Sequence, residues 1–298
     1  MKLQLKIKDT KAFIHFFDAF KGISPHQLLH IRYDTITSRR IDHLSCIFKR
    51  HSVPTETIFD LSTVSVDPST FETFNIYCGL VNGKNVIEVL DKFKKTTNLT
   101  AILDITRVGT TDNWITSEIT FSSPDVNFKF HCTSTEMFDT LDGSGKIINI
   151  DNIDSLIQRL SNSDNAEFSF NIMSEQIQKI MNYSSIESSG EYINFGIMNS
   201  KSTDNKPSIV ISDSALFDFK IDSSSTSDIK ISEDLDEKDY MSDPMQISKK
   251  MQLIMLDTNA NYTAHVWTNK LVLQELSNPS NTIIFAKIID PTDVTNPD

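Results

Sequence analysis

Residues 9–20 read DTKAFIHFFDAF, and this stretch decides how the rest of the chain is interpreted. Its four phenylalanines recur at i, i+3, i+4 and i+7, and they are Phe13, Phe16, Phe17 and Phe20. This spacing places them on one face of a helix, and Asp9 before them is a residue type that caps helix N-termini. A helix of about three turns is not stable alone, so the aromatic face is expected to pack on a sheet.

Three more short stretches have helical spacing, and their positions indicate a repeat. Their apolar stripes are Val86, Ile87, Leu90 and Phe93; Ile177, Ile180 and Met181; and Met251, Ile254 and Met255. Ile87 follows Phe13 by 74 positions, and Met251 follows Ile177 by the same 74. The chain therefore reads as strand, short helix and strands, repeated four times and grouped as two pairs.

Most of the remaining sequence predicts β-strands, because it is rich in β-branched and aromatic residues and many segments alternate apolar with polar positions. The expected strands are residues 3–7, 28–37, 43–51, 73–81, 100–108, 114–121, 126–133, 168–173, 192–198, 208–221, 262–276 and 282–289. The predicted fold class is α+β, with two similar domains that each have antiparallel sheets and two short helices on one face. The glycines at 143 and 145 mark the connector. The predicted bounds are 1–140 for the first domain, 141–152 for the connector and 153–298 for the second domain.

The composition favours a globular intracellular protein. The chain has 28 Lys and Arg against 40 Asp and Glu, a net charge of -12, although residues 1–60 carry a surplus of +4. An acidic protein can still hold DNA on one basic face, because dissolved salt screens the electric field of a surface charge over a Debye length of about 8 Å. The three cysteines, Cys46, Cys78 and Cys132, are isolated in the sequence, which favours a reducing compartment. Without a secretory leader or a run of roughly 18 apolar residues, the protein is expected in the cytoplasm and not in a membrane.

Motifs for catalysis or metal binding are missing. Residues 143–146, GSGK, lack the first glycine and the Ser or Thr of a phosphate loop, and the acidic residues 234–239 lack the glycine and glutamate of a calcium loop. No C-x-x-C, H-E-x-x-H or G-x-S-x-G occurs. Strand alternation is expected to scatter His26, His30 and His43. The chain is therefore predicted to be no enzyme and to use no cofactor or metal.

The order of these segments resembles that of the sliding clamps, the ring-shaped processivity factors of DNA polymerases. Residues 1–20 are similar to the opening strand and helix of phage clamps, and residues 74–105 resemble the second helix of the first domain with its flanking strands. Residues 168–182 and 245–274 resemble the helix-bearing segments of the second domain. Residues 283–293, IIFAKIIDPTD, are similar to the last strand and acidic tail of proliferating cell nuclear antigen.

The resemblance implies a head-to-tail homotrimer whose six domains close into a ring. The helices would line the hole and the sheets would form the outer wall, with edge strands pairing between subunits. The implied partners are double-stranded DNA, held without sequence readout, a DNA polymerase and a clamp loader. A viral origin of phage type is implied as well, with the protein in the cytoplasm of the host cell.

Two sets of site residues follow from the resemblance. The DNA-facing set consists of Lys11, His15, Lys84, Lys92, Lys95, Lys179, Lys249 and Lys250. The four helical stretches together carry a net charge of +3, which has the sign that phosphate contact requires. The set expected in a groove for partner peptides consists of Met137, Phe138, Ile147, Ile148, Ala286, Lys287 and Ile288. The ordinary alternatives are solvent-exposed lysines for the first set and core or loop anchors for the second.

Two rival functions fit the same sequence. A β-rich viral structural or scaffold protein would have these strands and would need no basic helix face. A monomeric DNA-binding processivity factor would keep the fold and hold DNA by charge, so that it would dissociate steeply with salt.

Overall fold

The computed structural model divides into two compact units, Met1–Ile41 with Arg50–Leu156 and Asp42–Lys49 with Ile157–Asp298. The residues that the structure describes are 1–20, 26–42, 47–94, 98–138, 140–141, 147–148, 155, 157–185, 192–199, 207–213, 218–224, 226–232, 245–248 and 256–287.

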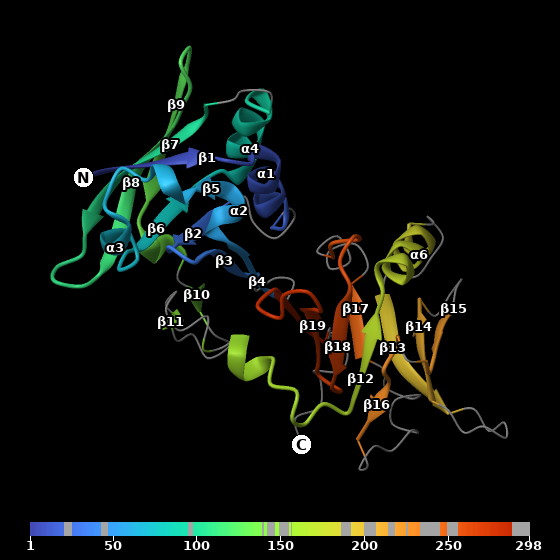
Figure 1. The fold of residues 1–298 in the computed structure, drawn as a ribbon. Coiled ribbons are helices and arrows are strands. Elements are labelled where there is room, and N and C mark those ends of the chain that lie inside the picture. Colours follow the sequence, from blue (N-terminus) through green and yellow to red (C-terminus); the bar gives the residue numbers. More distant parts are fainter. Residues whose placement is uncertain are drawn as a thin grey trace. The chain divides into compact units, whose positions relative to one another are not determined.

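The first unit is built on a mostly antiparallel sheet with the strand order β5-β1-β7-β8-β9-β6-β2-β3-β4 (Figure 1). Its strands are β1 (Lys2–Ile7), β2 (Gln27–Ile31), β3 (Thr35–Asp42), β4 (Ile47–Pro54), β5 (Phe59–Asp60), β6 (Asn75–Leu80), β7 (Thr100–Arg107), β8 (Asn113–Ser122) and β9 (Asn127–Thr133). Alternate residues of β1, Leu3 and Leu5, are fully buried, while their neighbours Lys2 and Gln4 are exposed. This alternation gives the sheet one apolar face and one polar face.

Two helices, α1 (Thr10–Asp18) and α4 (Gly83–Lys92), lie side by side against this sheet (Figure 1). Asp9 Oδ1 accepts the amide of Lys11 at 2.8 Å and that of Ala12 at 3.0 Å, so the predicted cap of α1 is confirmed. The remaining short elements of this unit are α2 (Thr55–Ile58), η1 (Leu61–Thr63), α3 (Pro68–Phe71), η2 (Thr135–Phe138), β10 (Thr140–Leu141) and β11 (Ile147–Ile148).

The aromatic stripe of α1 forms the centre of the core of the first unit. The ring of Phe13 lies edge-on to Phe59 at 5.4 Å and to Phe121 at 6.2 Å, which ties the helix to β5 and β8. Val86 and Leu90 of α4 are buried in the same core. The apolar stripes thus fix the face that each helix turns to the sheet, and the opposite faces remain exposed.

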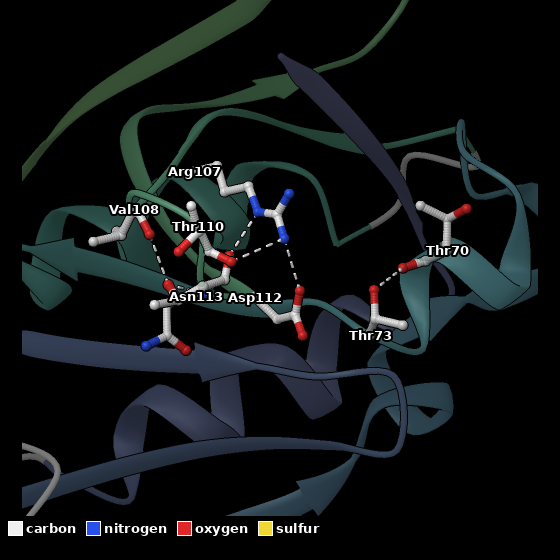
Figure 2. A network of polar contacts seen from close by, with 8 residues as sticks. Thr70, Thr73, Arg107, Val108, Thr110, Asp112 and Asn113 are labelled. Carbon is white, nitrogen blue, oxygen red and sulfur yellow. Dashed lines mark hydrogen bonds and ion pairs between the residues drawn. The ribbon is translucent and has the colours of Figure 1, made fainter.

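The loop between β7 and β8 is tied to the start of β6. Arg107 donates hydrogen bonds to the carbonyls of Thr110 and Thr111 and to the carboxylate of Asp112 (Figure 2). The amide of Asn75 donates to the carbonyl of Asp112 at 3.0 Å. This contact lies where β6 begins a short parallel pairing with β8 before it turns to β9.

In the second unit, the described strands fall into two antiparallel groups with the orders β16-β12-β18-β19-β20 and β15-β14-β13-β17. They are β12 (Phe168–Ile172), β13 (Tyr192–Asn199), β14 (Pro207–Ser212), β15 (Asp218–Asp222), β16 (Lys230–Ile231), β17 (Met245–Ser248), β18 (Tyr262–Val266), β19 (Lys270–Glu275) and β20 (Thr282–Ala286). Helix α6 (Ser174–Ser184) follows β12 and buries Ile177 and Ile180. Asn261 Oδ1 accepts the amide of Ser174 at 2.8 Å and holds the start of this helix.

The predicted α+β fold with antiparallel sheets and short helices is confirmed. Three of the four predicted helical stretches, those of Phe13, Val86 and Ile177, are α1, α4 and α6, whereas Met251, Ile254 and Met255 of the fourth lie outside the described residues.

Three predicted strands, 28–37, 208–221 and 262–276, are wrong, because each of them is two antiparallel strands. The first is β2 and β3, where the Arg32 amide donates to the Thr35 carbonyl at 2.9 Å and the Arg32 guanidinium donates to Asp34 at 2.8 Å across the turn. The second is β14 and β15, and the third is the hairpin of β18 and β19. The predicted domain bounds stay predictions.

Candidate nucleic-acid interface

The exposed faces of α1 and α4 form one polar surface, because the two helices lie side by side. We call it the helix surface, and its residues are Lys11, His15 and Asp18 of α1 with Lys84, Asn85, Glu88, Asp91 and Lys92 of α4. Lys11, His15 and Asp18 recur at i, i+4 and i+7, the spacing that keeps them on the side opposite the phenylalanines. The structure thus brings four predicted DNA-facing residues, Lys11, His15, Lys84 and Lys92, to a common face.

The charges of the helix surface nearly cancel. Lys84 Nζ lies 3.9 Å from Glu88 Oε1, one turn further along α4. Asp91 is paired with Lys94, which follows the helix. Lys11 and Lys92 form no ion pair with any other described residue, so their ammonium groups are the ones available to phosphate. With Asp18 exposed on α1, the net charge of this face is close to zero.

Helix α6 has a similar balance in the second unit. Glu175 and Lys179 are exposed and four residues apart, so their charges offset one another. Gln178 Nε2 donates to the carbonyl of Thr258 at 3.0 Å. Tyr183 is 45% exposed near the end of the helix. The predicted DNA-facing residue Lys179 therefore lies on a polar face whose net charge is zero.

The other predicted DNA-facing residues, Lys95, Lys249 and Lys250, lie outside the part of the chain that the structure describes.

Of the predicted groove residues, Ile288 also lies outside the described residues. Met137 and Phe138 end η2, and Ile147 and Ile148 form β11, which pairs with β10. Ala286 ends β20, and Lys287 follows with its amide donating to the carbonyl of Asn269 at 2.8 Å. Both are partly buried, so the peptide groove stays a prediction.

A cleft of about 890 Å³ opens at the N-terminal end of α1, and the sequence did not predict it. Its charged lining consists of Lys6, Lys8, Lys11 and Lys94 with Asp9, Glu56 and Asp60. The Ser62 hydroxyl, and then the charges of Lys6 and Lys8, lower the pKa of Asp60. Sequence reasoning missed the cleft because Lys6 and Lys8 read as ordinary exposed positions around a strand.

Two of the cysteines, which are isolated from one another in the sequence, lie close together in the structure. Cys78 Sγ lies 3.4 Å from Cys132 Sγ, because β6 and β9 are neighbours in the sheet although 54 residues separate the two cysteines. Cys78 is fully buried, and Cys132 is partly exposed. Only the strand pairing reveals this proximity, and the spacing in the sequence carries no signal of it.

The histidines that the structure describes do not gather into a metal site. His30 stacks on Tyr77 with 4.5 Å between ring centroids, and burial, followed by the charges of Arg39 and Arg32, lowers its pKa to about 4. His43 lies outside the described residues. Within those residues, no group of three or more His, Cys, Asp or Glu is arranged to hold a metal ion. No described helix has the length and apolar character needed to cross a bilayer.

Comparison with known proteins identifies the fold. No protein-family model matches the sequence, and no curated protein does. Among solved structures, the crystal structure of PCNA from Thermococcus kodakaraensis matches with a TM-score of 0.57 over 96% of this chain and 98% of that chain, at 12% sequence identity. The chain therefore has a fold like that of a PCNA subunit, along nearly its whole length.

Proposed function

We propose that the chain is a sliding clamp, a homotrimeric ring that encircles double-stranded DNA and tethers a DNA polymerase as a processivity factor. The observation that carries the proposal is a nearly neutral helix surface on a PCNA-like fold. A protein that held DNA by charge alone would need several available cations, because such affinity comes from counterions released at each phosphate contact. A closed ring holds DNA topologically and needs only loose contacts, which Lys11 and Lys92 supply.

Two strand edges support a head-to-tail assembly. Residues 127–131 of β9 pair only with β8 among the described strands, and β15 pairs only with β14. These edges belong to different strands, so joining the β9 edge of one copy to the β15 edge of the next is a heterologous contact, which closes into a ring when the rotation permits. Charged groups on each edge are already paired within the chain, Lys129 with Glu118 at 3.2 Å and Lys220 with Asp222 at 3.1 Å. The two edges would therefore join through their main-chain N–H and C=O groups.

The remaining parts of the proposal concern partners and origin. The ring acts without catalysis, a clamp loader opens it, and the polymerase inserts a peptide into the groove predicted from the sequence. The similarity of the first strand and helix to those of phage clamps supports a viral protein that works in the cytoplasm of the host cell.

Retention on circular DNA at high salt tests the proposal. The chain, loaded onto a nicked circular plasmid, is expected to remain bound in 1 M NaCl and to leave when the plasmid is linearised. Light scattering of the same preparation at high protein concentration is expected to give the mass of a trimer. Equal loss from circular and linear DNA would overturn the ring and favour a monomer held by charge, and absence of any DNA retention at low salt would favour a structural protein.

A further inference from the structure

We propose that Cys78 and Cys132 form a reversible intramolecular disulfide when the chain meets a hydroperoxide, and that the bond fixes β9 to β6. The two sulfur atoms are 3.4 Å apart, and a disulfide needs about 2.05 Å, so each sulfur has to move by less than about 1 Å. The proposal does not depend on the ring.

The strand register places both side chains on one face of the sheet. Gly79 pairs with Thr133 and Leu80 pairs with Cys132, so Cys78 is the diagonal neighbour of Cys132. Diagonal neighbours in an antiparallel pair are ordinarily about 7–8 Å apart, yet here the two sulfur atoms approach to 3.4 Å. Closing the bond therefore requires rotation of the side chains and a small approach of the two strands, with no change of register.

The difference in exposure assigns a role to each sulfur. Cys132 is partly exposed and can meet a small oxidant, whereas Cys78 has no exposed surface. Its hydrogen bond with Cys132, together with burial, raises the pKa of the Cys78 thiol, which keeps that sulfur protonated. Cys132 is thus the sulfur that is oxidised first, and Cys78 is the one that then attacks the sulfenic acid to form the disulfide.

The reaction balances with hydrogen peroxide as the two-electron oxidant. The Cys132 thiol gives up its proton and attacks one peroxide oxygen, the O–O bond breaks, and Cys132 becomes a sulfenic acid with release of water. The Cys78 thiol then loses its proton as its sulfur attacks Cys132, the S–O bond breaks and a second water leaves. Two thiols and one peroxide give one disulfide and two waters, and a dithiol reductant reverses the change.

A disulfide between Cys78 and Cys132 would join β6 and β9 where their pairing is short. Only two residue pairs join β9 to β6 among the described residues, since residues 75–77 of β6 pair with β8 instead. A covalent bond at this short joint would hold the C-terminal half of β9 in place. Oxidation is therefore expected to slow hydrogen exchange of the β9 amides, which is a local effect.

The test uses full-length protein with Cys46→Ser, so that only the pair remains. After treatment with hydrogen peroxide and alkylation under denaturing conditions, we expect both thiols to disappear together, an intact mass lower by two hydrogen atoms, and slower exchange in β9. Dithiothreitol should restore all three readouts. Retention of both thiols, oxidation of Cys132 to a sulfinic acid beside an intact Cys78, or a disulfide between two chains would each overturn the proposal.

Two further substitutions in this background are the controls. With Cys132→Ser, the buried Cys78 should keep its thiol under the same treatment. With Cys78→Ala, Cys132 should gain oxygen and the two-hydrogen loss should not occur. Circular dichroism verifies that each variant is folded, and if Cys78→Ala does not fold, the Cys132→Ser arm and the reversibility of the mass change still decide the outcome. Loss of the Cys78 thiol in the Cys132→Ser protein would contradict the proposal that Cys132 is oxidised first.

Discussion

Arg107 and Asp112 face each other across the loop between β7 and β8, with Nη2 of the arginine 3.0 Å from Oδ1 of the aspartate. The same guanidinium donates from Nε to the carbonyl of Thr111 at 2.6 Å (Figure 2). Since both charged side chains are about half exposed, the ion pair by itself contributes little. The hydrogen bonds of the planar guanidinium to the loop carbonyls are the larger contribution, because no single ammonium can make all of them.

Replacing Arg107 by lysine is therefore expected to lower the free energy of unfolding by about 1 kcal/mol, the value of a lost hydrogen bond. Urea denaturation of the purified chain measures it. Asp112→Asn removes the charge but keeps an acceptor, so this control should change stability by less than about 0.5 kcal/mol. A lysine variant as stable as the parent would show that the forked geometry contributes nothing.

Gly109 in the same loop has a φ of +57°, a left-handed backbone conformation, and a Cβ added there would meet no atom within 4 Å. The substitution Gly109→Ala is expected to cost about 1 kcal/mol through backbone strain alone, because alanine rarely adopts this conformation. Gly109→Asn is the matched control, since asparagine tolerates it better. Thermal unfolding compares the two, and equal melting temperatures would refute the strain argument.

The cap of α1 predicts a third effect on stability. Asp9→Ala removes the acceptor for two helix amides and should cost about 1 kcal/mol, whereas Asp9→Asn should retain most of it. Asp18→Ala, at the exposed C-terminal end of the same helix, changes the net charge equally without touching the cap. If Asp18→Ala and Asp9→Ala lower the free energy of unfolding in urea by the same amount, the loss comes from the change in net charge and not from the cap.

His30 makes stability depend on pH. Its pKa in the folded chain is about 4, below the ordinary 6.5, so between these values the unfolded chain binds a proton that the folded chain does not. The stabilisation is complete above pH 6.5 and is lost as pH falls toward 4. Between pH 8 and 5.5 the loss is about 1.4 kcal/mol. His30→Phe should remove this part of the pH dependence, as seen in urea midpoints of the two proteins. Parallel pH curves would contradict a buried neutral histidine.

The helix surface predicts a weak salt response. The double variant Lys11→Ala and Lys92→Ala is expected to reduce the slope of log affinity against log salt by about 2 for a short linear duplex, since each phosphate contact contributes about 0.9. Lys2→Ala with Lys230→Ala is the matched control, because Lys2 lies on the opposite, polar face of the same sheet and Lys230 lies on β16, outside the helix surface and both proposed strand edges. Fluorescence anisotropy gives the slopes. An equal change of slope in both double variants would show that DNA does not bind at the helix surface.

The fold was largely predictable where one side of an element is buried. The spacing of the phenylalanines in α1 and the alternation in β1 predict which face of each element is buried, because apolar residues recur with the period of the helix or the strand. The turns were harder. The segment from Leu28 to Thr37 contains no glycine or proline, so its reversal depends on the Arg32–Asp34 contact, which is invisible to periodicity.

For the candidate site, the sequence predicted which cationic side chains are exposed but not the contacts that they make. Lys11 and Lys92 were found from helical spacing, but the pairing of Lys84 with Glu88 weakens the charge that the count implied. The proximity of Cys78 and Cys132 depends on which strands are neighbours, a property of the whole sheet that no local pattern contains. Sequence reasoning thus gave the faces of the elements and missed contacts between elements distant along the chain.

The pairing of β1 with β7 also determines the order in which the molecule can be made. Leu3 lies opposite Leu103, so a hundred residues must be synthesised before this strand meets its partner. At about 5–20 residues per second, β1 waits for roughly 5–20 s after leaving the ribosome with its apolar side chains unsheltered. The nascent chain is consequently exposed to aggregation during that interval, and a chaperone bound to its first residues would protect it until the partner strand emerges.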